Sequence, residues 1–424
     1  MALTKLTKNL IDGTFGTEWV STIQTSNFTA EAAKGYFVNT TSAEITVTLP
    51  AGVVGNEVII QDYAGTFATN KVIFASNGSE KIQGTTDDYK CVTNNATVNL
   101  VYQDATKGWT ADNIEDNVIP LTVSYLVVAG GGSGSGFYRA GGGGAGGLRT
   151  SYGSISGGGG SSETPITFSL ATNYTVTVGA GGAGAGNTEG ANGSNSVFST
   201  VTSIGGGKGG RYTSSTGTAG TSGGSGGGGG GDATGGAGGA AVTSPVVQGY
   251  AGGSGASSNI QCGGGGGGAG AVGQSGGSGA TDGDGGAGIQ STVLSYANAG
   301  TASVGEQISG SQVWYGGGGG GGSYASGNDT TPGKGGGGEG TNPTNYPDNG
   351  GNGDNNTGGG GGGASGESPP GSGVGGSGGS GVVILRYPSG YTISGLTQSS
   401  GSPFTEGTDK ISVFTAGTGN IQFN

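Results

Sequence analysis

The sequence predicts a mainly β protein whose largest domain is built from packed, extended glycine helices of the polyglycine-II type. Two observations lead to this fold class. First, 95 of the 110 glycines in this 424-residue chain lie between residues 121 and 387, many of them in unbroken runs (226–231, 263–268, 316–322 and 358–363). Second, short alternating or apolar stretches separated by turn residues flank that region, and such stretches are typical of β-strands.

Residues 1–30 are expected to form an attachment arm. Leu3, Leu6 and Leu10 have a spacing that would suit one turn of helix, but Gly13 and Gly16 soon interrupt it. Because glycine weakens a short helix, we favour an extended arm.

Residues 31–120 predict a small β-sandwich-like module. Ile45, Val47 and Leu49 alternate with polar residues, so one face of that stretch is apolar. Trp109 is expected to fill the core at the end of the module. Similar short strands, separated by turn signals, are expected at 35–39, 44–50, 57–61, 71–75, 89–93 and 97–102.

Residues 121–387 form the expected glycine-rich domain. The apolar stretches 123–129 and 381–387 stand at its two ends, and we expect them to pair and close it. A second strand pair is expected inside the domain, with 165–170 joined to 174–178 by a short turn. Residues 388–424 return to β composition and are expected to form a short C-terminal β segment.

The glycine runs allow three interpretations. A flexible linker does not require so many long runs. Collagen needs glycine at every third position and much proline, whereas these glycines are consecutive and the chain has only 11 prolines. Extended glycine helices fit best, because only glycine lets backbones approach closely on all sides, and every N–H and C=O must then find a partner in a neighbouring segment.

The non-glycine inserts between the runs are expected to turn at the two ends of this domain. They are rich in Tyr, Ser, Thr and Asn, a composition typical of binding loops on a rigid scaffold. Two alternatives stay open: Trp314 and Tyr315 could be a hydrophobic cap or a stacking platform, and the arginines could bind anionic groups or simply be solvated. The candidate receptor-binding residues are Tyr138, Arg139, Arg211, Tyr212, Trp314, Tyr315, Tyr324 and Tyr346.

Several activities are disfavoured by composition. Histidine is absent, which removes His-based catalysis and His-ligated metals, and two cysteines cannot supply the four ligands of an all-cysteine zinc site. Lys208 and Lys334 are each followed by Gly, so no Walker A motif exists. A net charge of −12 argues against nucleic acid. Glycoside cleavage needs two facing carboxylates, and a pair such as Glu306 with Asp329 is expected to arise by chance among 26 acidic residues. Asp282, Asp284, Asp348 and Asp354 could bind calcium but are expected to be solvated turn residues. We therefore expect no catalytic residues, no metal and no cofactor.

Several motifs lie along the glycine-rich and C-terminal parts of the chain: VSYLVVAGGG (123–132), AGGGGAGGLRT (140–150), YTVTVGAGG (174–182), GSNSVF (193–198), GVVILRY (381–387) and FTAGTGNIQF (414–423). Together they resemble the glycine-rich domain and the usual ending of tailed-phage fibre proteins, which are common in marine phages. The motifs YFVN, VTLP and DYAGTF, with Trp109, lie in the segment 35–109 of the first module, which resembles a β module of the same proteins.

The resemblance implies a virion fibre or adhesin, made in the host cytoplasm and carried on the tail or fibre. Its architecture would be similar in kind to the polyglycine sandwich of T-even-type fibre-tip adhesins, whose loops contact the receptor. The implied partners are a host surface glycan or outer-membrane protein and other virion proteins, and a homotrimer is compatible with it. The alternatives are a structural fibre or decoration protein that binds no receptor, and a glycan-cleaving spike.

Overall fold

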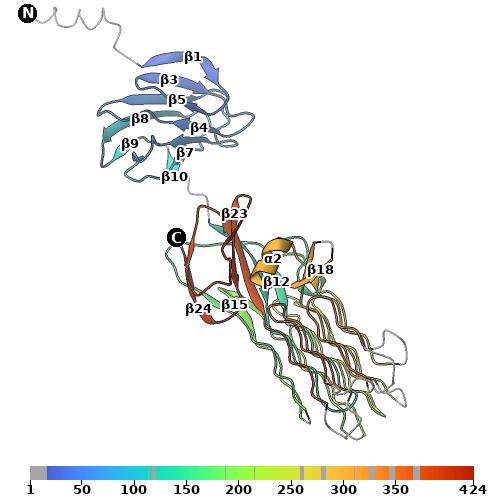
Figure 1. Ribbon diagram of the computed structural model, residues 1–424. Coiled ribbons are helices and arrows are strands. Elements are labelled where there is room, and N and C mark those ends of the chain that lie inside the picture. Colours follow the sequence, from blue (N-terminus) through green and yellow to red (C-terminus); the bar gives the residue numbers. More distant parts are fainter. Residues whose placement is uncertain are drawn as a thin grey trace, which may run out of the picture. The chain divides into compact units, whose positions relative to one another are not determined.

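The computed structural model describes residues 17–112, 114–116, 121–186, 188–213, 215–257, 262–277, 283–309, 311–323, 330–342, 349–365 and 373–424. The chain divides into two compact units, Met1–Pro120 and Leu121–Asn424 (Figure 1). Strands far outnumber helices among the regular elements of the described residues, where the helices are the short α2 and the single 3-10 turn η1 (Gly157–Gly159). The predicted mainly β class is therefore confirmed.

The first unit consists of two five-stranded sheets, with the orders β1-β3-β5-β8-β9 and β10-β7-β6-β4-β2. From β1 to β6, successive strands alternate between the sheets, and neighbours within each sheet run parallel. The strands are β1 (Glu18–Gln24), β2 (Phe28–Thr29), β3 (Lys34–Val38), β4 (Ile45–Thr48), β5 (Glu57–Asp62), β6 (Val72–Ala75), β7 (Tyr89–Cys91), β8 (Thr97–Asp104), β9 (Gly108–Thr110) and β10 (Glu115–Asp116).

One apolar core joins the two sheets of this unit. Val47, Ile60, Phe74 and Trp109 are all fully buried in it, and Trp109 fills the core as predicted. Residues 18–29, which fall in the predicted arm, instead form β1 and β2.

Strand β1 forms within the predicted arm because Trp19 packs against the neighbouring strand β3. The Trp19 ring stacks on Phe37 with a centroid distance of 4.7 Å. The ring also covers Gly35 so closely that an added Cβ there would lie 2.8 Å from it. Strand β1 is therefore held to β3 by side-chain packing as well as by backbone pairing.

In the second unit, the two apolar stretches at the ends of the glycine-rich region form an antiparallel pair, as predicted. β11 (Thr122–Val128) pairs with β20 (Val382–Pro388), and Val128 lies opposite Val382. The pair is central in the sheet β12-β11-β20-β23-β22. Its other strands are β12 (Leu148–Thr150), β22 (Phe404–Glu406) and β23 (Asp409–Phe414), and β13 (Ile166–Thr167) also pairs with β11.

The predicted hairpin between 165–170 and 174–178 is wrong. β13 joins the first sheet, whereas β14 (Tyr174–Thr177) lies in a second one, β16-β15-β14-β24-β21. Between them Phe168 packs against Phe198 and Phe423 in the core that the two sheets share, so the chain crosses from sheet to sheet instead of turning back. The other strands are β15 (Ser196–Phe198), β16 (Val201–Ser203), β21 (Ile393–Gly395) and β24 (Thr418–Phe423).

The first sheet of this unit is covered on both faces. Alternate residues such as Val127 and Leu385 face the second sheet. Their neighbours Leu126 and Ile384 face a third layer, which holds α2 (Tyr296–Ala302) and the small sheet β17-β19-β18. Burial on both faces explains why 123–129 and 381–387 are mostly apolar instead of strictly alternating. The small sheet comprises β17 (Ile289–Gln290), β18 (Glu306–Ile308) and β19 (Gln312–Tyr315).

The glycine segments run from these strands to the opposite end of the unit and back (Figure 1). Their hydrogen bonds repeat with a period of three, because three successive N–H groups point to three different neighbouring segments. The segment 141–147 shows this pattern, with every bond running from N–H to C=O. Gly141, Gly144 and Gly147 donate to a first neighbouring segment, at Gly210, Gly207 and Ile204. Gly142 and Ala145 donate to a second one, at Gly264 and Gly267, and Gly143 and Gly146 donate to a third, at Gly361 and Gly358.

Close backbone contacts leave no room for a side chain at most of the glycines inside this bundle, where small residues such as Ala145 and Ser225 are also buried. A Cβ added to Gly143 would lie 2.1 Å from the carbonyl oxygen of Gly132, and one added to Gly266 would lie 1.9 Å from that of Gly143. At the edges, asparagine side chains replace missing carbonyl partners: Asn349 and Asn352 accept from the N–H groups of Val374 and Ser377. Larger side chains are thus confined to the edges and the two ends.

Candidate functional site

The candidate site lies at the end of the glycine segments away from the strands. Phe137 ends the run that leaves β11, and its N–H donates to Gly373, three residues beyond the bond from Gly134 to Gly376. The returning segment begins with Gly141, whose N–H donates to Gly210 and so places the turn 137–139 beside Arg211. Two loops that are distant in sequence therefore meet at this end.

Three aromatic rings from the two loops form one cluster. The Phe137 and Tyr138 rings meet edge to face at 4.8 Å between centroids, and Tyr212 lies 5.9 Å and 5.6 Å from them. All three side chains are half-buried. Phe137 and Arg139 have φ angles of 75° and 46°, a left-handed conformation that is uncommon in residues with a side chain. Residues with such a strained backbone conformation cluster at functional sites such as ligand-binding loops.

Charged groups adjoin the rings. The Arg139 guanidinium lies over the Tyr212 ring at 5.3 Å, a cation–π arrangement. One of its terminal nitrogens is 3.9 Å from Oδ1 of Asp232, whose side chain is only 8% exposed. That oxygen also accepts from the N–H of Ala233. We call Phe137, Tyr138, Arg139, Tyr212 and Asp232 the tip cluster.

The structure brings together four of the eight predicted receptor-binding residues. Tyr138, Arg139, Arg211 and Tyr212 lie in the two loops just described. Phe137 and Asp232 were missed, although Phe137 begins the same insert and Asp232 directly follows a glycine run. Asp232 gave no usable signal, because an aspartate after a glycine run is also typical of an ordinary turn.

The remaining candidates lie elsewhere. Tyr315 is fully buried in the core beside α2, and burial raises the pKa of its hydroxyl, so its side chain is out of reach of a partner. Trp314 points away from that core and is half-buried, with the Lys334 ammonium 5.5 Å from its ring centroid. The burial of Tyr315 therefore favours a hydrophobic cap over a stacking platform for this residue. Tyr324 and Tyr346 lie outside the described residues.

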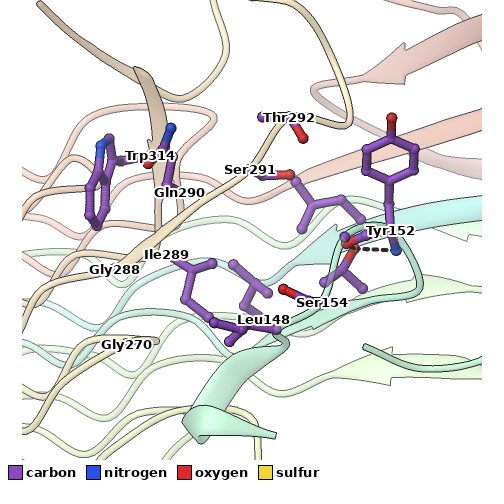
Figure 2. A pocket seen from close by; sticks show the side chains of 14 residues that line it. Leu148, Tyr152, Ser154, Gly270, Gly288, Ile289, Gln290, Ser291, Thr292 and Trp314 are labelled. Atoms are coloured by element: carbon purple, nitrogen blue, oxygen red, sulfur yellow. Dashed lines mark hydrogen bonds between the residues drawn. The ribbon is translucent and has the colours of Figure 1, made fainter. Parts of the chain in front are cut away.

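Trp314 lines a pocket of about 450 Å³ at the strand end of the unit (Figure 2). Its walls come from β12 and the loop that follows it, from β17 and its following loop, and from glycines at the ends of two runs. The lining side chains include Leu126, Leu148, Thr150, Tyr152, Ser154, Ile155, Ile289, Gln290, Ser291 and Thr292.

Two acidic residues of the glycine-rich region, Asp284 and Glu306, accept hydrogen bonds from backbone N–H groups. Oδ1 of Asp284 accepts from Thr331, and Oε2 of Glu306 accepts from Gly335 and Gly336. The described residues include no cluster of three or more Cys, Asp or Glu placed to hold a metal ion. Within the same residues, no helix has the length and hydropathy needed to cross a membrane.

A family model described as a glycine-rich domain matches residues 105–388, which is about two thirds of the sequence. The chain belongs to this glycine-rich domain family. The match begins just after β8 and ends at Pro388, the last residue of β20, so it contains every glycine run and both loops of the tip cluster. A search of the curated proteins finds no match for the chain. Membership of the family thus concerns the scaffold, and the role of the tip cluster has to be argued from its own chemistry.

Proposed function

We propose that the glycine runs are polyglycine-II helices packed into a hydrogen-bonded bundle. A helix with three residues per turn presents successive N–H groups in three directions, as the bonds of 141–147 do. At ~3.1 Å per residue, the seven glycines of 316–322 would span ~22 Å. Such a bundle holds the loops at its ends in fixed positions.

We further propose that the protein is a phage virion fibre or adhesin that binds a host cell surface through the tip cluster. The aromatic cluster of Phe137, Tyr138 and Tyr212 carries this proposal. Tyrosine and arginine are enriched in binding hot spots. Tyrosine supplies rigid contact area at a small cost in entropy, and arginine supplies directed hydrogen bonds. The bundle supplies the rigid support that such a site needs.

The proposed partner is a host surface glycan or an outer-membrane protein. Arginine next to tyrosine suits both, because the guanidinium binds carboxylates and phosphates while the rings stack on sugars or apolar side chains. Other virion proteins would hold the opposite end of the chain. The proposal includes no catalytic step and no cofactor.

Binding of the full-length protein to a panel of bacterial strains, measured by flow cytometry, tests this proposal. The variant carries Tyr138→Ala and Tyr212→Ala together. Tyr296→Ala is the matched control, since Tyr296 is 38% exposed and lies on α2, far from the loops in the chain and at the strand end. We expect saturable binding by wild type and control, and a loss of at least about tenfold in the double variant.

Two results would contradict the adhesin. One is equal binding by the double variant and the wild type, with both proteins folded by circular dichroism. The other is the absence of binding to every strain, which would favour the alternative of a structural fibre or decoration protein.

A further inference from the structure

The pocket at the strand end offers a second site that is independent of the tip cluster. Its floor is apolar, because Leu126 and Leu148 are fully buried and Ile289 is 9% exposed. Figure 2 shows Trp314 and Tyr152 on either side of Leu148 and Ile289. A volume of about 450 Å³ is in the range of small-molecule sites, roughly 300–1,000 Å³.

Neutral polar groups surround this floor. The side chains of Ser154, Gln290 and Thr292 line the pocket and make no hydrogen bond to other described residues. They stay available to a ligand. By contrast, the hydroxyl of Thr150 is committed, because it donates to the carbonyl of Tyr125 at 2.8 Å and accepts from the N–H of Tyr152.

The aromatic wall is held in place by its own contacts. Trp314 lies opposite Gln290 in the small sheet, and its indole N–H donates to the side chain of Gln312 at 3.2 Å. A fixed indole ring beside an apolar floor suits a ligand with one apolar face. The adjacent hydroxyl and amide groups suit a ligand whose rim is made of hydroxyls.

No charged side chain is among the residues that line the pocket in the described part of the chain. Two cations of the described residues contact the aromatic walls but are not lining residues. The Arg386 guanidinium lies 5.1 Å from the Tyr152 ring and is paired with Asp409 and Glu406, and the Lys334 ammonium lies 5.5 Å from the Trp314 ring. An anionic ligand would therefore gain little. An acyl chain would displace water from the side chains of Ser154, Gln290 and Thr292 without offering them hydrogen bonds, which is unfavourable.

We propose that this pocket binds a neutral saccharide of one or two rings. The sugar's C–H face packs on Trp314 and the apolar floor, and its hydroxyls bond to Ser154, Gln290 and Thr292. This site gives the protein a glycan contact at the end opposite the tip cluster.

The test uses the full-length protein with lactose, maltose and N,N′-diacetylchitobiose as neutral probes and glucuronic acid as the anionic one. Saturation-transfer NMR detects binding and calorimetric titration measures it. We expect saturable binding of at least one neutral probe, weakened by at least about tenfold in Trp314→Ala. Ser154→Trp, which changes an exposed residue at the rim and fills the pocket, is expected to have the same effect.

Tyr138→Ala is the matched control and should leave this binding unchanged, which separates this site from the tip cluster. The proposal is overturned if no neutral probe binds the wild type. It is also overturned if folded Ser154→Trp and Trp314→Ala proteins bind as well as the wild type, or if glucuronic acid binds as tightly as the neutral probes.

Discussion

Replacing Gly143 by alanine tests whether backbone contact holds the glycine-rich unit together. The new Cβ would lie 2.1 Å from the carbonyl oxygen of Gly132, whereas ordinary contacts begin at 3.4 Å. The neighbouring segment must therefore move by about 1.3 Å. That carbonyl accepts from the N–H of Gly361 at 2.9 Å, and the N–H of Gly143 donates to Gly361 at 2.7 Å, so the movement disrupts bonds on both sides.

The expected cost follows from two terms. Overpacking costs about 1–3 kcal/mol, and each buried backbone group left without a partner costs a further 1–3 kcal/mol. We therefore expect Gly143→Ala to lower the free energy of unfolding by about 2–6 kcal/mol, which is a large part of a typical total of about 5–15 kcal/mol.

Gly186→Ala is the matched control. Its Cβ would meet only a methyl of Val374, at 3.8 Å, which is an ordinary contact. Alanine also reduces the entropy of the unfolded chain, so this variant should be unchanged or stabilised by up to about 1 kcal/mol.

Hydrogen exchange with mass spectrometry is the suitable assay, because it follows each unit separately. Peptides covering 129–147 should lose protection in Gly143→Ala and keep it in Gly186→Ala, while peptides of the first unit serve as an internal reference. Equal protection of 129–147 in the two variants would refute the argument that close backbone packing excludes side chains here.

Three other perturbations have defined outcomes. Asn352→Ala removes the side-chain acceptor of one backbone N–H at the bundle edge, and should cost about 1 kcal/mol and speed amide exchange in 373–381. Arg149→Ala leaves the carboxylate of Glu163 without its buried partner, so a loss of about 3 kcal/mol is expected in thermal unfolding. Partial desolvation and the nearby Glu306 raise the pKa of Asp354, so the native state binds this proton more tightly than the unfolded state. The contribution of Asp354 to stability should then fall as the pH rises through and above about 4, so the melting temperature of Asp354→Asn relative to that of the wild type should rise over that range.

The strands of this protein could be predicted where side chains carry the information. The alternation of Ile45, Val47 and Leu49 predicts a strand with one buried face, and all three are buried. The pairing of 123–129 with 381–387 follows from two apolar stretches at the ends of one domain. The predicted hairpin at 165–178 failed because its strands have better partners far away, in β11 and β24.

The partners of the glycine segments could not be predicted. Gly142 bonds to Gly264 and Gly143 bonds to Gly361, but no side chain distinguishes these residues from their neighbours. Register in such a bundle is set by the inserts and by edge residues such as Asn349 and Asn352, which are three residues apart and accept from Val374 and Ser377, also three apart. The three-residue spacing of asparagines is the sequence signal that marks a bundle edge.

The assembly of the tip cluster could not be predicted from the sequence either, because it depends on the partners of the glycine segments. The sequence shows that Tyr138 and Tyr212 interrupt glycine runs, but not that the two inserts meet. Their meeting depends on the bond from Gly141 to Gly210, which belongs to the glycine segments and carries no side-chain signal. Since most interior glycines leave no room for a Cβ, a change of recognition must come from the inserts and the edges. Such a scaffold can therefore exchange its loops without altering its interior, and stability and recognition reside in different residues.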